Sequence, residues 1–587
     1  MSEKRNSYLV SKALKTFMLA SVLASLAQRL ATMTDAIVVS NLIGPDAISA
    51  INVVTPIITL FPAISILFGI GGSILAAKAI GRRDADEANR VFTTSLIAAF
   101  VCSAVLTIVL FLLTPDVVAL VCPRNSRFFD MAVSFMHIMS LSGVPMVLGF
   151  TLQNFVKTDG NPRLVMMAVM SSTALNFVLD IVFVKYFGLG IAGSAWATII
   201  CFLFSMSVCL THFFSSHCSF RLDWSLLKGK LSIVHYPLSI IKEGFPASIS
   251  TLMMGVCVFG FNSIVIHTLG ADGMYVWSVC LQLLMLVQLM LSGVGSSIYS
   301  MGGLLIGERD MIGLHILIRR VLAYVGITLL ALLLVIEIWP QIFGNLFGGG
   351  DSGLADQLHS ALRIFSLLLL PFALISILNA LYQLLGYRTA SIVISLTQLA
   401  AMVFFVWLFA LISPSALWWG YPASSIVLVA VVLTVTWVLH LRRTELAPVT
   451  LIPQVTEGKA LNFSIRLTEA DVASALGRID TFLDDCGIPR PVAYSVRLCS
   501  EELLYNIVRY AVKKHPDQHF IDIHIRYTAS LVTLLLKDDG RPFNPLLRAS
   551  DSMEHLGLRL VNGVTHDMTY QYMYDQNMVF IKFPCVQ

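Results

Sequence analysis

Twelve long apolar runs dominate the first three quarters of this 587-residue sequence. A helix needs about 20 predominantly apolar residues to cross a bilayer, and each run reaches that length. Only 13% of the residues are charged, whereas soluble domains carry about 25%. The sequence therefore predicts an all-α polytopic membrane protein. The expected spans are 13–41, 47–79, 92–114, 131–157, 163–187, 191–215, 240–269, 273–306, 315–340, 358–386, 390–412 and 416–440.

Two motifs recur at a fixed offset within these runs. Gly44 and Gly270 lie in similar turns, and Gly81 and Gly307 begin similar charged loops. Each pair is 226 positions apart (270 − 44 and 307 − 81), and a long repeat with a fixed offset indicates two copies of one unit. With six spans in each copy, we predict two six-helix parallel repeats that bind substrate between them near the bilayer midplane. The predicted repeats cover residues 1–225 and 226–443.

Lysine and arginine are distributed unevenly between the two sides of the membrane. They gather on the side of the N-terminus, as at 82–83 and 442–443, whereas the opposite loops carry only Arg124, Arg127 and Lys185. Positive charge marks cytoplasmic loops, so we expect both ends of the membrane part in the cytoplasm. The net charge of +4 is too small to indicate a nucleic-acid partner.

The N-terminal apolar run and the cysteines give weaker signals. Basic residues precede the first run without a convincing cleavage site, so we expect a retained first helix rather than a signal peptide. The ten cysteines are scattered and show no paired metal-ligand spacing. We interpret them as small packing residues.

A few charged residues remain inside the apolar runs. Arg29 and Asp35 lie in the first run, and Asp180 lies in the fifth, four residues after Asn176 and therefore on the same helix face. A charge in a bilayer costs several kcal/mol unless it is paired or hydrated. The carboxyl groups either pair with Arg29 or with backbone groups, or they line a polar pathway that takes up and releases protons.

Several motifs of the membrane part belong together. They are Asp35, Gly44, Asp46, Gly69 to Ser73, Gly81 to Asp84, Glu87 to Asn89, Asn154, Asp159 to Arg163, Asn176 to Asp180, Gly188 to Gly193, Ala197 and Thr198. Together they resemble the multidrug and toxic compound extrusion (MATE) family. The similarity covers about residues 10–440, and the second half repeats the pattern of the first.

This resemblance implies a secondary antiporter that exports small cationic or amphipathic organic compounds across the lipid bilayer against inward flow of H⁺ or Na⁺. In the proton-coupled branch of the family, a polar network in the N-terminal lobe couples transport to protons. The matching residues here are Asp35, Asn154, Asn176, Asp180 and Thr198. The sodium-coupled branch has a carboxylate after a Gly-x-Pro turn, but the run after Gly244-Phe245-Pro246 holds no acid. We expect Glu243, just before that turn, to be interfacial.

The chain changes character after residue 443. Residues 444–460 form a linker with turn-forming proline and glycine, and 461–587 contain no spanning run. Their periodicity predicts a cytoplasmic α+β sandwich. The expected strands are 461–467, 519–527, 531–537, 567–573 and 578–583, and the expected helices are 469–486, 491–514 and 555–563.

This tail contains three motifs in a characteristic order: Glu502 with Asn506, the turn from Asp538 to Phe543, and the segment from His555 to Val561. Together they resemble the anti-sigma factor serine kinases of the GHKL superfamily, the histidine kinase-like ATPases. The resemblance implies that ATP and Mg²⁺ bind here. Glu502 would activate the attacking hydroxyl, and Asn506 would bind Mg²⁺. Asp538 or Asp539 would accept a hydrogen bond from adenine. Gly540 would allow the backbone to approach the adenine ring closely, and Gly557 would face phosphate.

Two departures from this family favour nucleotide binding over kinase turnover. Glu554-His555 stand where the family has lid glycines, and a negative charge there disfavours a triphosphate. Tyr510 stands where the family often has histidine. We leave open whether the tail is a serine/threonine protein kinase.

We therefore predict a bacterial plasma-membrane exporter, coupled to H⁺ through its N-lobe carboxylates. Its cytoplasmic tail would regulate transport by binding ATP or by phosphorylating an anti-anti-sigma-like protein. Two alternatives remain: a ligand-sensing receptor whose output is the tail kinase, and a lipid-linked precursor flippase. Few basic residues lie inside the membrane, which favours the exporter over the flippase.

Overall fold

A computed structural model describes most of the chain as two compact units. The described residues are 6–215, 218–223, 230–342, 355–454, 458–511, 518–548, 561, 563, 565 and 567–585. Residues 18–310 and 318–452 form the membrane unit, and residues 1–17, 311–317 and 453–587 form the C-terminal unit. Each unit is described by itself.

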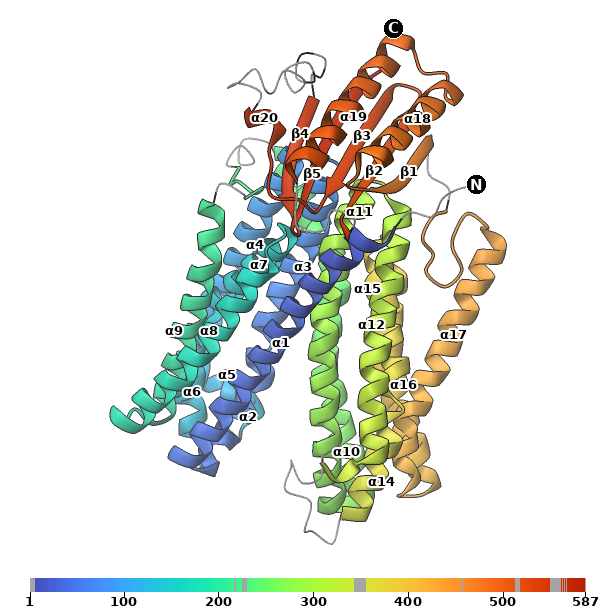
Figure 1. The fold of residues 1–587 in the computed structure, drawn as a ribbon. Coiled ribbons are helices and arrows are strands. Elements are labelled where there is room, and N and C mark those ends of the chain that lie inside the picture. The colour runs from blue at the N-terminus through green and yellow to red at the C-terminus, as the bar shows by residue number, and fades with distance from the viewer. Residues whose placement is uncertain are drawn as a thin grey trace. The chain divides into compact units, whose positions relative to one another are not determined.

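The first half of the membrane part is built from apolar helices (Figure 1). Two helix breaks in it are of interest: a 51° bend between α6 and α7, and a π-helix, η1, directly after α8. The elements are α1 (Tyr8–Leu42), α2 (Pro45–Ile58), α3 (Leu60–Gly81), α4 (Ala85–Leu112), α5 (Thr114–Val121), α6 (Phe129–Ser140), α7 (Gly143–Thr158), α8 (Pro162–Asp180), η1 (Ile181–Tyr186), α9 (Gly190–Leu210) and η2 (Thr211–Phe214).

The second half has the same kind of architecture. Its first helix, α10, is two helices joined across a kink at Gly270, whose φ of 65° and ψ of −154° are not helical. The elements are α10 (Lys230–Ser297), η4 (Ile298–Gly302), α11 (Gly303–Gly307), α12 (Met311–Ile338), α14 (Ala355–Ser366), α15 (Leu369–Leu384), α16 (Arg388–Ile412), η5 (Ala416–Trp419) and α17 (Gly420–Arg442).

The number of spans agrees with the sequence prediction. Among the described residues, 11 helices are long and apolar enough to cross a membrane, or 12 if the bent pair α6 and α7 is one span. Each predicted range overlaps one of these helices. The prediction of a mostly helical membrane protein is therefore confirmed.

Glycines allow the first and second halves to meet at backbone contact. A Cβ atom on Gly81 would lie 2.8 Å from the Cα atom of Gly307, and one on Gly307 would lie 2.7 Å from the Cα atom of Gly81. Likewise, a Cβ atom on Gly244 of α10 would lie 1.9 Å from the carbonyl oxygen of Leu67 in α3. Any larger residue would separate these helices, so glycine is required at these contacts.

The C-terminal unit contains a five-stranded antiparallel sheet of order β1-β2-β3-β5-β4. Each strand lies within two residues of its predicted range. The strands are β1 (Lys459–Arg466), β2 (Phe520–Thr528), β3 (Leu531–Asp538), β4 (Asp567–Met573) and β5 (Gln576–Pro584), and the helices are α18 (Glu469–Asp485), α19 (Arg490–Tyr510) and α20 (Pro545–Arg548). The predicted helix 555–563 falls almost entirely outside the described residues.

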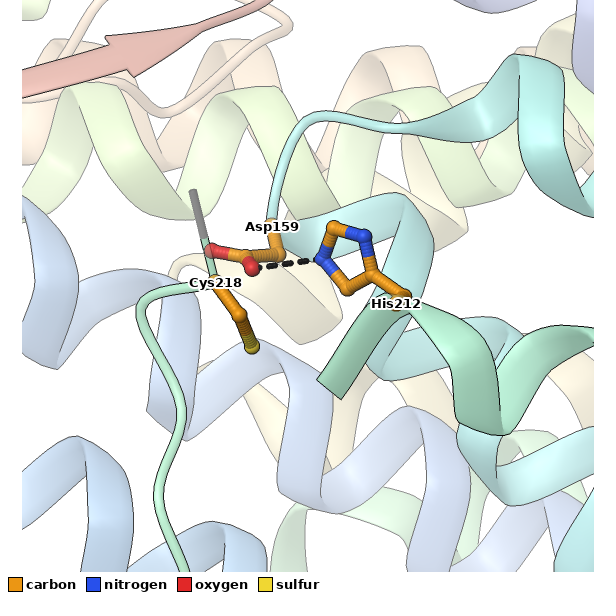
Figure 2. A group of neighbouring side chains, drawn as sticks. All are labelled: Asp159, His212 and Cys218. Atoms are coloured by element: carbon orange, nitrogen blue, oxygen red, sulfur yellow. Dashed lines mark hydrogen bonds and ion pairs between the residues drawn. The ribbon is translucent and has the colours of Figure 1, made fainter. Parts of the chain in front are cut away.

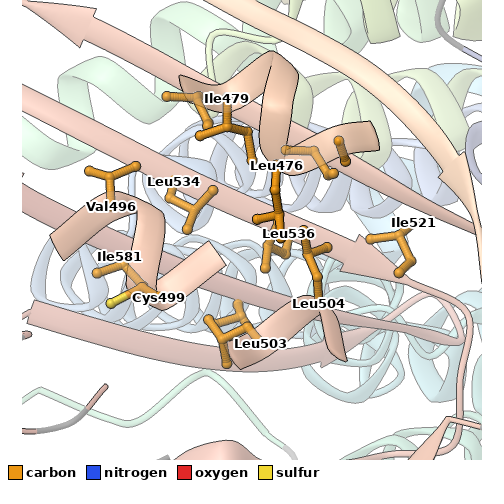
Figure 3. Packing of buried hydrophobic residues seen from close by; sticks show 14 of the residues in the cluster. Leu476, Ile479, Val496, Cys499, Leu503, Leu504, Ile521, Leu534, Leu536 and Ile581 are labelled. Carbon is orange, nitrogen blue, oxygen red and sulfur yellow. The ribbon is translucent and has the colours of Figure 1, made fainter. Parts of the chain in front are cut away.

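Apolar side chains join α18 and α19 to the sheet (Figure 3). Leu476 and Ile479 of α18 and Leu503 of α19 pack against Leu534 and Ile581 of the central strands. Residues 521–525 of β2 and 534–538 of β3 are all buried. The packed layers hold the end of β3 and the end of α19 in fixed positions, and the nucleotide motifs lie there.

Candidate functional site

Two carboxyl groups lie beside each other inside the membrane unit. Asp35 belongs to α1, and the fully buried Asp180 is the last residue of α8. Asp35 interacts with Asp180 and with the buried Asn176, and Asp180 also interacts with Ser194 of α9. The π-helix that follows Asp180 is a feature often found at functional sites.

Three of the four oxygen atoms of these carboxyl groups have no hydrogen-bond partner among the described residues. They are both carboxyl oxygens of Asp180 and the Oδ1 atom of Asp35, and all three are buried. Arg29 does not neutralise them, because its Nη2 atom instead donates to Oε1 of Gln282 at 2.5 Å. Two buried carboxylates this close cannot both stay charged without a cation, so the pair can hold a proton or a cation.

The other two predicted coupling residues bond within their own helices. Asn154 Nδ2 donates to the carbonyl of Phe150 at 2.9 Å, and Thr198 Oγ1 donates to the carbonyl of Ser194 at 3.0 Å. No hydrogen bond joins either side chain to the carboxyl pair among the residues described. The site thus brings Asp35, Asn176 and Asp180 together, and neither Asn154 nor Thr198 forms a hydrogen bond to them among the described residues.

Sequence reasoning missed two neighbours of the pair on α9. Ser194 and Cys201 both interact with Asp180. They are seven residues apart, about two helical turns, and so share one helix face. That spacing could have identified them once α9 was placed beside α8.

Glu243 is buried beside two cationic side chains of other helices. Its side chain is only 2% exposed, and it accepts a hydrogen bond from Arg388 of α16 at 2.8 Å and lies 3.8 Å from Nζ of Lys78 of α3. Both cations come from helices distant in sequence, so local patterning gave no sign of this burial. Both cations lie at Oε1 of Glu243, whereas its Oε2 atom is buried without a hydrogen-bond partner among the described residues.

A small pocket lies in the C-terminal unit between α19 and the ends of β3 and β5. It contains two of the predicted nucleotide residues, Asn506 and Asp538. The lining is Leu503, Asn506, Ile507, Tyr510, Ala511, Asp538, Phe543, Pro545, Asn577 and Val579.

The turn after β3 holds Asp538 in a fixed orientation. Oδ1 of Asp538 accepts hydrogen bonds from the Gly540 amide at 2.7 Å and from Asn577 Nδ2 at 2.9 Å. A Cβ atom on Gly540 would lie 2.5 Å from both Asp538 Oδ1 and the Cβ atom of Ala511, so only glycine fits. Asn577 escaped sequence reasoning because it reaches this turn through strand pairing, opposite Asp538 in the register of β3 and β5.

The other residues that were predicted to bind nucleotide differ in their position relative to the pocket. Glu502 is half-buried on α19, one turn before Asn506, and is not among the pocket-lining residues. The rings of Tyr510 and Phe543 are parallel within 7°, with centroids 5.9 Å apart, and both line the pocket. Gly557, together with Glu554 and His555, lies outside the described residues.

Asp539 has a role different from that of Asp538. The buried Asp539 carboxylate accepts hydrogen bonds from Lys12 and from Nδ1 of His519, the latter at 2.8 Å. Burial alone would raise the pKa of Asp539, but these two hydrogen bonds hold that pKa below its usual value. Asp538 therefore lines the pocket, whereas Asp539 binds the N-terminal segment.

That N-terminal segment, residues 6–17, belongs to the C-terminal unit. The Asn6 amide donates to Ser464 Oγ at 3.1 Å, and Gln576 Nε2 donates to the Leu9 carbonyl at 2.8 Å. Two aromatic contacts support the docking: Tyr8 with Phe520 at 5.2 Å and Phe17 with Tyr574 at 5.7 Å between centroids. The beginning of α1 is thus fixed beside the turn that carries Asp538.

Comparison with known proteins agrees with this two-part architecture. Residues 20–182 match the MatE family, and residues 465–583 match the histidine kinase-like ATPase domain. The multidrug export protein MepA of Staphylococcus saprophyticus is 25% identical over 36% of this chain and 46% of MepA. The probable multidrug resistance protein YoeA of Bacillus subtilis is 22% identical over 54% of this chain and 69% of YoeA. The matched region thus spans about half the length of the S. saprophyticus MepA chain.

Solved structures share the fold of the membrane part. A MOP superfamily transporter from Pyrococcus furiosus, described by the reversed polarity of its binding pocket, superposes with a TM-score of 0.67 at 22% identity. An outward-facing multidrug resistance MATE family transporter superposes with the same score at 21% identity. Each comparison covers 73% of this chain and 97% of the solved chain. This chain therefore has the fold of these transporters in its membrane part, with a match to the MatE family at residues 20–182, and a match to the histidine kinase-like ATPase domain at residues 465–583.

Proposed function

We propose that this protein is a secondary antiporter that exports small cationic or amphipathic organic compounds and is driven by protons. The unpartnered carboxyl pair of Asp35 and Asp180 is the observation that carries the proposal. This carboxyl pair must hold a proton or a cation. It therefore suits an antiport in which the site binds either a proton or the cationic substrate, but not both at once. The multidrug export described for MepA and YoeA supports the substrate class.

Alternating access would follow from two parallel six-helix repeats, at 1–225 and 226–443. This relation is supported by Gly81 and Gly307, which are 226 positions apart and contact each other. Contacts of this kind hold the halves together at one end, so rocking of one half against the other would open and close the path. The distribution of lysine and arginine favours the cytoplasmic side of a bacterial plasma membrane for that end and for both termini.

Proton coupling would supply enough free energy for concentrative export. One proton moving down about 100 mV contributes ~2.3 kcal/mol, and one pH unit adds about 1.4 kcal/mol. One-to-one exchange could therefore sustain a substrate gradient of a few hundred-fold. No ATP hydrolysis is required for the transport step.

We infer that the tail, 461–587 after the linker 444–460, binds ATP with Mg²⁺ and regulates the transporter. The pocket that contains Asn506 and Asp538 supports nucleotide binding. Nucleotide binding would influence the membrane part through α1. This helix carries both Lys12, which binds Asp539, and Asp35 of the carboxyl pair. Kinase activity would add Glu502 as the catalytic acid and an anti-anti-sigma-like protein as the phosphate acceptor.

Export from proteoliposomes tests the transport proposal. Fluorescent-cation efflux is measured under an imposed pH gradient, under an Na⁺ gradient and without a gradient, for the whole chain and for a chain ending at residue 443. We expect efflux with the pH gradient in both proteins and modulation by ATP only in the whole chain. Loss of efflux in a folded, membrane-inserted shorter chain would contradict the regulatory role of the tail.

A receptor is the second candidate, and the docking of the N-terminal segment beside the nucleotide turn favours it. In a receptor, ligand would bind the membrane part and change nucleotide turnover without export. Ligand-dependent ATP turnover in a protein that shows no flux under either gradient would replace the antiporter by this function.

A further inference from the structure

A histidine, a cysteine and an aspartate converge in the membrane unit, outside the carboxyl pair (Figure 2). Asp159 directly follows α7, His212 lies in η2, and Cys218 lies in the segment after η2. Their ligating atoms all lie within 4.8 Å of one another, and Asp159 and His212 are buried. We propose that Asp159, His212 and Cys218 bind a Zn²⁺ ion.

The spacing of these atoms suits a small metal ion. Zinc bonds of about 2.0 Å to oxygen and nitrogen and 2.3 Å to sulfur place these tetrahedral ligand atoms about 3.3 to 3.5 Å apart. Asp159 Oδ2 and His212 Nε2 now share a hydrogen bond of 2.7 Å. Binding would replace that hydrogen bond by two metal bonds, with movements of about 1 Å.

The charges of the three groups also balance a divalent ion. A carboxylate, a thiolate and a neutral imidazole together carry two negative charges, so a bound Zn²⁺ would leave the buried site neutral. The mixed oxygen, nitrogen and sulfur set favours zinc over Mg²⁺ or Ca²⁺, which prefer oxygen alone. Three protein ligands leave a fourth position for water.

The surroundings orient the ligands and limit the access of water. The Ser219 amide donates to both carboxylate oxygens of Asp159, at 3.0 and 3.3 Å. Such a second donor fixes a ligating carboxylate. Aromatic rings pack nearby in a continuous cluster, with centroid distances of 5.0 Å for Phe92 and Phe213, 5.2 Å for Phe92 and Phe220, and 5.4 Å for Phe155 and Phe220.

The site would join three parts of the first half. The segment that holds Cys218 continues along α4, where the Arg221 amide donates to Asn89 Oδ1 at 2.7 Å and the Asp223 amide donates to Thr93 Oγ1 at 2.9 Å. A metal ion would therefore tie the ends of α7 and α9 to a segment already attached to α4. The sequence did not predict this site, because the three residues follow no paired ligand spacing.

Metal titration of the purified full-length protein tests the proposal. After chelator treatment, Co²⁺ is added as a spectroscopic probe, and Zn²⁺ then competes for the site. We expect one Co²⁺ per chain with a thiolate-to-cobalt charge-transfer band that Zn²⁺ removes. Cys218→Ser should abolish the band and weaken Zn²⁺ binding more than the 10- to 100-fold typical of a lost outer-shell partner, whereas Cys102→Ser, at an exposed cysteine of α4, should change neither.

A second measurement needs no variant and so avoids any folding defect. Alkylation of the wild-type cysteines is followed by mass spectrometry with and without Zn²⁺. We expect Zn²⁺ to slow alkylation of Cys218 and to leave that of Cys102 unchanged. Equal protection of both cysteines, no protection, or an unaltered cobalt band in Cys218→Ser would overturn the site.

Discussion

Each part of this protein contains a pair of neighbouring carboxyl groups, and the pairs differ in how they are satisfied. In the membrane unit, Asp35 and Asp180 leave three buried oxygen atoms without hydrogen-bond partners among the described residues. In the C-terminal unit, Asp538 is held by Gly540 and Asn577. Its neighbour Asp539 is held by Lys12 and His519.

This difference separates an exchangeable site from a fixed one. A buried carboxyl group without partners gains most from a proton or a cation and can release it when substrate arrives. A carboxylate with donors on several sides keeps its charge and its orientation, which suits recognition of a ligand group or docking of a segment. The same residue type thus supports transport in one part and recognition in the other.

The largest expected effect concerns the membrane pair. Asp180→Asn removes the ionisable group but keeps its size, so the substrate gradient sustained by a pH gradient should fall from a few hundred-fold to about onefold. Efflux from proteoliposomes under a pH gradient measures it. Thr198→Ala is the matched control, because Thr198 bonds only within α9 in this structure, and it should retain most of the gradient. Full activity of Asp180→Asn would exclude Asp180 as the coupling residue.

The nucleotide pocket gives the next effect. Asp538→Asn replaces a charged acceptor by an amide and disturbs the hydrogen bonds from Gly540 and Asn577, at a cost of about 1.5–3 kcal/mol. ATP affinity should therefore fall about 10- to 150-fold in a binding titration. Asp567→Asn, at a half-exposed residue paired with Lys582, serves as the control. Unchanged affinity in Asp538→Asn would show that adenine binds elsewhere.

Stability provides a direct contrast between the two pairs. Asp539→Asn weakens two charge-assisted hydrogen bonds and should destabilise the C-terminal unit by about 1–3 kcal/mol. Asp180→Asn should leave the melting temperature unchanged or raise it, because it removes a buried charge without partners. Thermal unfolding in detergent measures both. Equal destabilisation by the two substitutions would remove the proposed distinction.

A smaller effect is expected at the docked N-terminal segment. Lys12→Met removes the ion pair with Asp539, and because the Lys12 side chain is 36% exposed, solvent screening limits the loss to about 1 kcal/mol. Hydrogen exchange in residues 6–17 should become faster. Slow exchange that persists in Lys12→Met would show that the other contacts hold the segment.

The pH dependence of this docking follows from the lowered pKa of Asp539. A lowered folded-state pKa means that the carboxylate contributes its full stability above the ordinary value of 3.8. This contribution is lost as the pH falls through the lower folded-state pKa. Wild-type protein should therefore lose docking in that acidic range, as seen by hydrogen exchange in residues 6–17. Asp539→Asn should lack this component of the pH dependence.

Local patterns predicted the elements but not the contacts between them. Apolar run length located the spans, and alternation located the strands of the tail. The spacing of Asn176 and Asp180 placed them on one helix face, whereas the pairing of Asp35 with Asp180 came only from family resemblance. A family resemblance assigns a role to a matching residue, but it does not show which groups surround that residue.

The missed residues reach their sites through tertiary packing. Asn577 arrives through strand pairing, Lys12 arrives from the far end of the chain, and Ser194 depends on the placement of α9 beside α8. The burial of Glu243 escaped prediction for the same reason, since its cations come from distant helices. No local spacing encodes these contacts.

Substrate-induced proton release tests the central claim most directly. Purified protein in weakly buffered detergent solution is mixed with a cationic export substrate, and the pH change is recorded for wild type, Asp35→Asn and Asp180→Asn. If the membrane carboxyl pair holds the exchangeable proton, wild-type protein should release about one proton per bound substrate, and the two variants should release none while still binding it. Equal release from all three proteins, or no release from wild type despite binding, would contradict the account.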